Sequence, residues 1–180
     1  MPTKQTASER LDVRHLERLP LGMSYPAQVA VAQDLLARPP LCGDASTRPA
    51  ELVIDETGVG RPVADLFNAA GSKPIQITIT AGLETTAQGL RRWHVAKTAL
   101  ISTLDARLHT GELRFAAALS EAPAMRDELL NFNRHVSASG RYSYQARATA
   151  HDDLVLAVAI GVWWAVRPAP PQPCFGTYGS

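Results

Sequence analysis

The sequence predicts an α/β fold, and three segments carry that prediction. A short apolar run over residues 51–55 is followed by a glycine-containing turn and a helix through residues 62–67. This strand, turn and helix form the βα unit of a sheet that is covered on both faces. Residues 75–80 alternate strictly between isoleucine and polar side chains, which is typical of a strand. Residues 149–164 begin with polar residues and continue almost wholly apolar, which indicates a buried helix.

Composition favours one globular domain. The chain has 180 residues with 46% hydrophobic side chains, enough for one core but leaving little room for a second. The formal net charge is +1 at pH 7, so nucleic-acid binding would have to come from a local patch. Cys42 and Cys174 lie outside any C-x-x-C spacing, which argues against a disulfide framework or a zinc site. No signal peptide or membrane span is expected, and we predict a cytoplasmic location.

The first fifty residues are expected to alternate between loops and two regular elements. Residues 1–10 have nothing to bury and are predicted to be disordered. Residues 11–20 alternate apolar and polar side chains before the phase slips, so they predict a half-exposed strand that ends at Pro20. Residues 26–37 have helical spacing with a proline in the first turn. A loop rich in Pro, Gly, Asp and Ser follows over residues 39–50.

After the strand at residues 75–80 we expect a loop that carries Gly82, Gly89 and the run Arg91-Arg-Trp-His94. Four elements are predicted beyond it: a helix from Lys97 to Gly111, a strand over 112–115, a helix over 122–135 and a strand over 142–146. The proline-rich residues 168–180 cannot continue the last helix and are expected to be a loose tail. The predicted domain therefore spans residues 11–167.

Three aspartates are candidate site residues. Asp152 and Asp153 open the last helix, where free N–H groups and the helix dipole favour carboxylates, so helix capping is an alternative explanation for both. Asp55 ends a predicted buried strand, and ligands of open α/β sheets bind outside the carboxyl ends of the strands. Mg²⁺ and Mn²⁺ phosphodiesterases need several such carboxylates to converge from different elements. These three could supply part of that cluster.

Two further motifs are less specific. Gly58-Val-Gly60 could be a phosphate loop, but it lacks the third glycine of a dinucleotide site and the Gly-Lys-Ser/Thr of a P-loop, so a tight turn is the simpler interpretation. Arg91 and Arg92 precede Trp93, and basic residues beside an aromatic can hold a nucleic-acid backbone and stack a base. Ordinary solvated side chains would give the same pattern.

An ordered set of motifs resembles the nuclease domain of tailed-phage terminase large subunits. In chain order these motifs are Leu52-Val-Ile-Asp-Glu-Thr-Gly-Val-Gly-Arg-Pro-Val63, Val95-Ala-Lys-Thr-Ala-Leu100, Gly111-Glu-Leu-Arg114 and Ala150-His-Asp-Asp-Leu-Val-Leu-Ala157. The segment Arg14-His-Leu-Glu-Arg-Leu-Pro-Leu-Gly22, followed by Ser24-Tyr-Pro26, is similar to the early strand and turn of that family. The resemblance extends from about residue 11 to residue 166.

The resemblance implies an RNase H-like fold, in which a mixed sheet has helices on both faces and an acidic metal cluster at one edge. It implies metal-dependent endonuclease cleavage of concatemeric phage DNA during packaging, with Mg²⁺ or Mn²⁺ held by Asp55, Asp152 and Asp153. His151 would either orient these acids or cap the helix. Lys97 matches a family lysine that could contact a DNA phosphate, although a solvated lysine is the alternative.

Partners implied by the resemblance are double-stranded DNA, the ATPase part of a terminase, the small terminase subunit and the portal. The sequence also departs from the family. The ATPase motor with its phosphate loop is absent, and nothing in residues 1–13 matches the first strand with its catalytic aspartate; Asp12 is the only nearby acid. We therefore expect an N-terminally truncated version of the fold with weak Mg²⁺ binding.

Two hypotheses about function follow. The first is a terminase-type nuclease domain, either part of a split large subunit or a prophage copy with weakened cleavage. The second is a non-catalytic DNA-binding or packaging-assembly module that keeps the fold and binds through Arg91, Arg92, Trp93 and Lys97. Another RNase H-like enzyme, such as a resolvase or transposase, fits the combined motifs less well.

Overall fold

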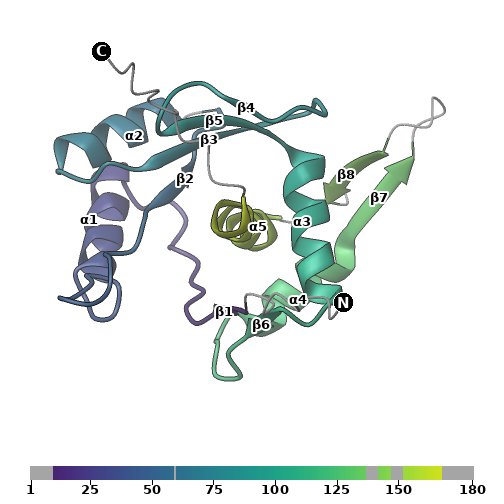
Figure 1. The fold of residues 1–180 in the computed structure, drawn as a ribbon, viewed down its shortest axis with the longest axis horizontal. Coiled ribbons are helices and arrows are strands. Elements are labelled where there is room, and N and C mark those ends of the chain that lie inside the picture. The colour runs from purple at the N-terminus through teal and green to yellow at the C-terminus, as the bar shows by residue number, and fades with distance from the viewer. Residues whose placement is uncertain (1–9, 59, 137–141, 147–151, 168–180) are drawn as a thin grey trace, which may run out of the picture.

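Helix α5 (Asp153–Val166) lies at the centre of the molecule, with the other elements arranged around it (Figure 1). The computed structural model describes residues 10–58, 60–136, 142–146 and 152–167. More than half of the 14 residues of α5 are buried, as its apolar sequence predicts. The helix begins at Asp153, later than expected, and residues 149–151 lie outside the described part of the chain.

A four-stranded sheet lies along one side of α5. Its order is β2 (Val53–Asp55), β3 (Ile75–Thr80), β5 (Arg92–Ala96) and β4 (Thr86–Ala87). The first three strands are parallel, and β4 pairs with β5 in the antiparallel direction. Ile75, Ile77 and Val95 share one face of this sheet and are buried in one hydrophobic core with residues of α5. The mixed sheet confirms the predicted α/β class.

Helices cover this sheet from two sides. Helix α1 (Tyr25–Leu36) packs against α2 (Gly60–Ala69), and β2 lies between this pair and α5 (Figure 1). The buried side chains of α2 include Ala64 and Phe67. Helix α3 (Lys97–His109) begins where β5 ends and packs along α5. The carboxyl end of β5 therefore leads directly into a helix that lies beside the central one.

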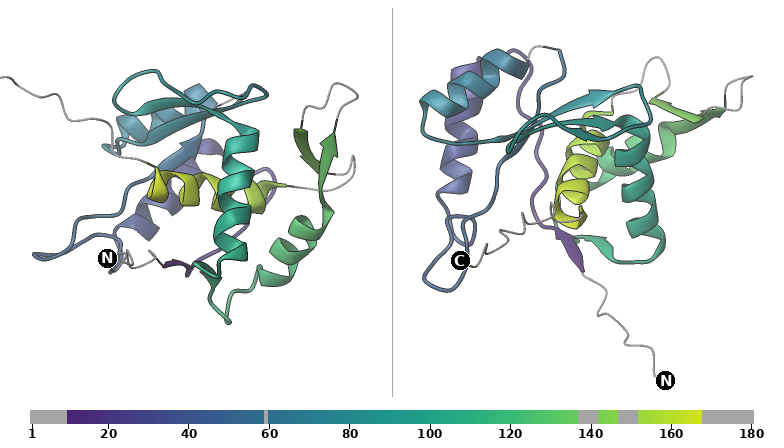
Figure 2. Two further views of the ribbon diagram at one scale, coloured as in Figure 1. Left: turned by 45° about the vertical axis from the view of Figure 1, so that its right-hand side comes forward. Right: turned by 45° about the horizontal axis from the view of Figure 1, so that its top comes forward.

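The remaining strands lie away from this sheet. Strand β1 (Leu11–Val13) pairs in parallel with β6 (Leu113–Phe115), across α5 from β2 (Figure 1). Helix α4 (Ala122–Asn131) leads into the antiparallel hairpin of β7 (Phe132–Val136) and β8 (Tyr142–Ala146), which projects from the body (Figure 2). Among the described residues, β1 pairs only with β6 and β2 only with β3. Each of these two edge strands borders α5.

Tryptophan side chains pack α5 against the sheet. The Trp93 ring of β5 meets Trp163 and Trp164 edge to face, with centroid separations of 5.7 and 6.3 Å. Such geometry is the favourable one for aromatic pairs. The indole Nε1 of Trp164 donates a 2.8 Å hydrogen bond to Glu51, just before β2. The face of β5 that carries Trp93 is therefore the face covered by α5.

Three predicted elements are wrong in type or extent. Residues Arg92 to His94 belong to β5 rather than to a loop, because pairing with β3 imposes strand geometry on polar residues. The strand predicted over residues 11–20 is only β1, since β6 offers three residues to pair with. The helix predicted over residues 122–135 ends at Asn131, where β7 begins. The other predicted strands and helices in the described part are found, with ends shifted by a few residues.

Among the described residues, no helix combines the length and apolar character needed to cross a bilayer. The tails predicted over residues 1–10 and 168–180 lie outside the described part, apart from Arg10.

Candidate metal centre

Asp55 is held at the carboxyl end of β2 by the turn that follows it. Its Oδ1 accepts a 2.7 Å hydrogen bond from the backbone N–H of Thr57. The Thr57 hydroxyl in turn accepts a 2.8 Å bond from the N–H of Ile79, and the N–H of Glu56 donates to the carbonyl of Ile77 at 2.7 Å. These bonds tie the turn to β3, so the Asp55 carboxylate has a defined direction at the sheet edge.

Asp55 and Asp153 line the same pocket. This pocket has a volume of about 230 Å³ and lies between β2 and the first half of α5; it is lined by Val53, Asp55, Asp153, Leu156, Ala157 and Ile160. Asp153 is 69% exposed. The structure therefore brings together two of the three predicted acids, from segments almost a hundred positions apart.

Asp152 has a different environment from its neighbour. Its side chain is 24% exposed and accepts a 2.7 Å hydrogen bond from the Lys97 ammonium at the start of α3. It does not line the pocket that Asp55 and Asp153 share. Lys97 also lies 5.4 Å from the centroid of the Phe132 ring. The structure thus places the predicted DNA-contacting lysine beside the predicted acids, in an ion pair with one of them.

The capping explanation for the aspartates is wrong for Asp152. This residue occupies the N-cap position of α5 but makes no capping bond with its side chain. The cap comes from Glu128 of α4, whose Oε2 accepts the N–H groups of Leu154 and Val155 at 3.0 Å each. Glu128 is only 6% exposed. A carboxylate from another helix therefore satisfies the first turn, and the two aspartates remain available for other contacts.

Arg18 joins this cap to the candidate metal ligand. Its guanidinium donates to the second carboxylate oxygen of Glu128 and to Oδ2 of Asp153 at 3.3 Å. It also lies 4.0 Å from Glu121. Arg18 and Glu128 are not among the site residues predicted from the sequence. Arg18 lies within the segment Arg14-His-Leu-Glu-Arg-Leu-Pro-Leu-Gly22, but no sequence pattern pairs it with Glu128, which lies 110 positions away.

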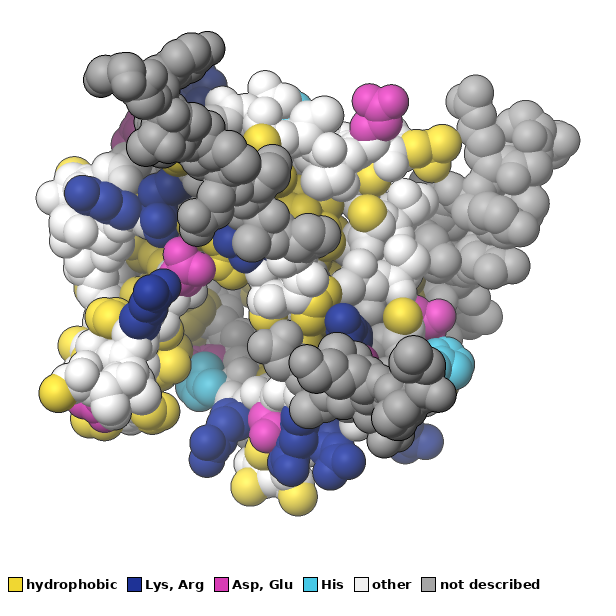
Figure 3. Space-filling model, viewed as in Figure 1, with side chains coloured by type: hydrophobic (Ala, Val, Ile, Leu, Met, Phe, Trp, Pro, Cys, Tyr) yellow, Lys and Arg dark blue, Asp and Glu magenta, His cyan; other side chains and the backbone are white. Residues whose placement is uncertain are grey.

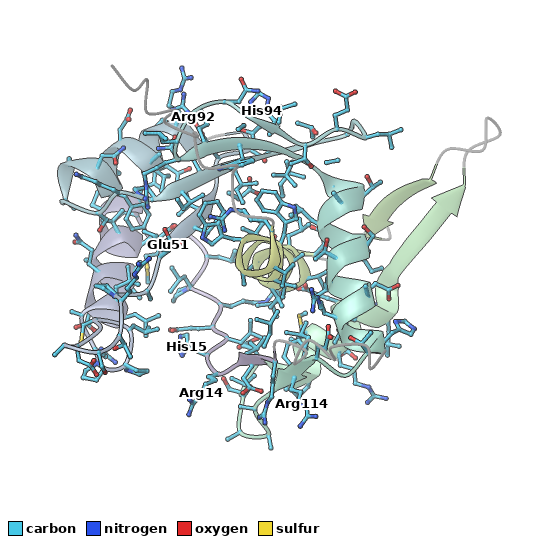
Figure 4. The ribbon with its side chains drawn as sticks, viewed as in Figure 1. Arg14, His15, Glu51, Arg92, His94 and Arg114 are labelled. Carbon is cyan, nitrogen blue, oxygen red and sulfur yellow. The ribbon has the colours of Figure 1, made fainter. Side chains whose placement is uncertain are left out.

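Arg91 and Arg92 do not lie with the acids. Side chains alternate along a strand, so Arg92 points to the sheet face opposite Trp93, away from α5. There it donates to Gln76 at 2.9 and 3.1 Å and lies 3.4 Å from Glu56. Figure 4 shows Arg92 at the outer side of the sheet. Arg91 lies 4.0 Å from Glu51.

A second group of basic side chains lies over β1 and β6 (Figure 3). Arg14 and Arg114 belong to it and are exposed, and Arg10 pairs with Asp12 at 2.8 Å. Figure 4 shows Arg14 and Arg114 at the lower edge of the molecule. None of these arginines is among the DNA contacts predicted from the sequence.

The two pocket carboxylates fit a divalent ion in type but make an incomplete set. Carboxylate oxygens are the ligands that Mg²⁺ and Mn²⁺ prefer, and Mg²⁺ usually keeps several waters beside one or two carboxylates. Within the described residues, no three Asp, Glu, His or Cys side chains form a group that could hold a metal. His151, the other predicted contributor, lies outside the described part.

Three solved structures match this chain, all of the large terminase nuclease from the thermophilic phage G20c. The forms with bound cobalt and with bound magnesium each align with a TM-score of 0.56 and 24% identity, over 78% of this chain and 62% of theirs. A third aligns with a TM-score of 0.54 and 23% identity, over 79% and 63%. The chain has the fold of a large terminase nuclease.

This match covers only part of the relatives. The chain spans about three fifths of the G20c nuclease chains, at 62 to 63% of their length. No protein-family model matches the sequence, and no curated protein sequence matches it either. The likeness therefore shows that the chain shares the fold of these nuclease structures, and it confirms the α/β fold predicted from the motifs.

Proposed function

We propose that this chain is a terminase-type, metal-dependent DNA endonuclease domain, and that residues 11–167 form that domain. The observation that carries the proposal is the shared pocket of Asp55 and Asp153, in a fold whose solved relatives include forms with bound magnesium and cobalt. The substrate is double-stranded DNA, cleaved during phage genome packaging in the host cytoplasm. The partners are the ATPase part of the terminase, the small subunit or the portal.

We assign each predicted site residue a role according to its position in the structure. Asp55 and Asp153 supply carboxylate oxygens to Mg²⁺ or Mn²⁺, with Asp55 oriented by the N–H of Thr57. An ion held there would lower the pKa of a bound water molecule and offset the charge that builds up on the scissile phosphate. Lys97 lies beside Asp152, where its ammonium can contact a DNA phosphate. Asp152 holds that lysine in place, a narrower role than the metal ligation expected from the sequence.

Cleavage by this chain alone is expected to be weak. Two carboxylates share the pocket, whereas two-ion phosphodiesterases use more carboxylates to hold a pair of ions. With fewer negative ligands the site binds Mg²⁺ weakly, so Mn²⁺ is the better ion for an assay. A prophage copy with weakened cleavage is therefore part of the proposal.

Plasmid nicking in Mn²⁺ tests the proposal. The purified chain should convert supercoiled plasmid to open circle, and Asp55→Asn and Asp153→Asn should each abolish that activity. Asp34→Asn is the matched control, because Asp34 is an exposed acid on α1 that is ion-paired with Arg38. Equal background nicking by all four proteins would exclude intrinsic catalysis.

A non-catalytic DNA-binding or packaging-assembly module is the second candidate. The observation that favours it is that both acids at the start of α5 are ion-paired, Asp152 with Lys97 and Asp153 with Arg18. Such a module would bind DNA with a strong salt dependence that is insensitive to Asp55→Asn and Asp153→Asn. Absence of DNA binding at low salt would exclude it.

A further inference from the structure

We propose that Arg18 is a positioning residue of the metal centre, an internal cation that holds Asp153 and competes with the divalent ion for it. This inference rests on the proposed function, since it concerns the same carboxylate. Arg18 comes from the segment after β1, within Arg14-His-Leu-Glu-Arg-Leu-Pro-Leu-Gly22, and lies 135 positions before Asp153.

The guanidinium lies between carboxylates of very different exposure. Its Nη1 is 3.3 Å from Oδ2 of the exposed Asp153, and its Nη2 contacts Oε1 of the buried Glu128. Arginine suits this position because its planar fork can serve two carboxylates with separate N–H groups, whereas a lysine is a single point charge. The contact with Asp153 is the longer and more exposed of the two.

Glu128 anchors Arg18 independently of Asp153. One oxygen of Glu128 accepts two backbone N–H groups of α5, and the other accepts from Arg18. A buried carboxylate keeps its cation, because losing the partner would leave its charge uncompensated. Arg18 can therefore release Asp153 to a metal while remaining bound to Glu128, at the rim of the site.

The positive charge of Arg18 then lowers the affinity of the site for a divalent ion. A unit positive charge roughly 6 Å from a doubly charged ion lowers the affinity about tenfold, even with the screening of water. A purely structural role predicts the reverse, because removing a support would leave the affinity unchanged or weaker. The sign of the change in metal affinity therefore separates the two roles.

Calorimetric titration of Mn²⁺ into the purified full chain tests this inference. Arg18→Gln should bind Mn²⁺ about tenfold more tightly than the wild type. Arg18→Lys should remain close to the wild type, because it keeps the positive charge. Arg14→Gln is the matched control: it removes an exposed arginine of the same segment and should not change the affinity.

A second variant allows the same test if Arg18→Gln does not fold. If Arg18→Gln leaves Glu128 without a partner and unfolds the chain, the double variant Arg18→Gln with Glu128→Gln takes its place. It should bind Mn²⁺ about tenfold more tightly than Glu128→Gln alone, because these two proteins differ only in the charge at position 18. Unchanged or weaker binding in the folded variant overturns the inference while the proposed function stands, provided that Asp55→Asn removes wild-type binding. Absence of Mn²⁺ binding in every protein, Arg18→Gln included, overturns both.

Discussion

Asp152 and Asp153 are neighbours in the chain, yet the two sides of the α5 start differ sharply. Asp152 is mostly covered and pairs with Lys97 of α3, whereas Asp153 is largely exposed and shares a pocket with Asp55. The difference arises because α3 packs on one side of α5 and β2 borders the other. Adjacent acids in one motif therefore have separate surroundings: Asp153 lines a pocket with Asp55, and Asp152 is paired with Lys97.

The largest expected effect is the loss of stability on removing Glu128, which caps the start of α5. Glu128→Ala should lower the free energy of unfolding by about 3 kcal/mol, because the first turn of α5 loses two charge-assisted capping bonds and Arg18 loses its buried partner. Urea denaturation measures this change. Glu121→Ala is the control: this acid lies 4.0 Å from Arg18 and does not cap α5, so little change is expected. Equal stability of both variants would show that Glu128 does not hold the helix start.

The next effect separates the two aspartates by metal affinity. Asp153→Asn should weaken Mn²⁺ binding by more than about tenfold, since changes in residues that merely support metal ligands already cost 10- to 100-fold. Asp152→Asn should weaken it far less, because its carboxylate does not line the pocket. Calorimetry on both variants makes the comparison. A larger loss in Asp152→Asn would reverse the assignment.

DNA binding should depend on Lys97 and not on Arg92. Lys97→Met should weaken binding across sequences and reduce the slope of affinity against salt by about one, as expected for one lost phosphate contact. Arg92→Met should leave the slope unchanged, since Arg92 lies on the other sheet face with Gln76 and Glu56. Fluorescence anisotropy over a salt series measures both. Equal slopes for the two variants would show that position on the sheet does not decide DNA contact.

The smallest expected effect is the contribution of the Asp152–Lys97 ion pair to the stability of the fold. The pair of Asp152 and Lys97 is partly exposed, so its coupling energy should be about 1 kcal/mol or less. A double-mutant cycle of Asp152→Asn and Lys97→Met, followed by thermal unfolding, gives this value. A coupling of several kcal/mol would mean that Asp152 is mainly a structural residue and that Lys97 is not available to DNA.

The sequence predicted the elements whose pattern is local. The isoleucine alternation identified β3, and the apolar length identified α5. Asp55 at the end of β2 and Asp153 at the start of α5 line one pocket, and their binding of a metal stays a prediction. Strand β5 is not predicted from the sequence, because the polar run Arg92-Trp-His94 is typical of a loop. The strand forms because this segment pairs with β3. The same holds for the site, since the contacts of Arg18 with Glu128 and Asp153 join segments more than a hundred positions apart.

The central claim is that Asp55 and Asp153 bind one divalent ion together. A double-mutant cycle on Mn²⁺ affinity, with Asp55→Asn, Asp153→Asn and the combined variant, tests it most directly. We predict that each single substitution removes the same binding site, so the combined variant loses little more than either alone. Retention of wild-type Mn²⁺ binding in both single variants, or two losses that add independently, would contradict the account.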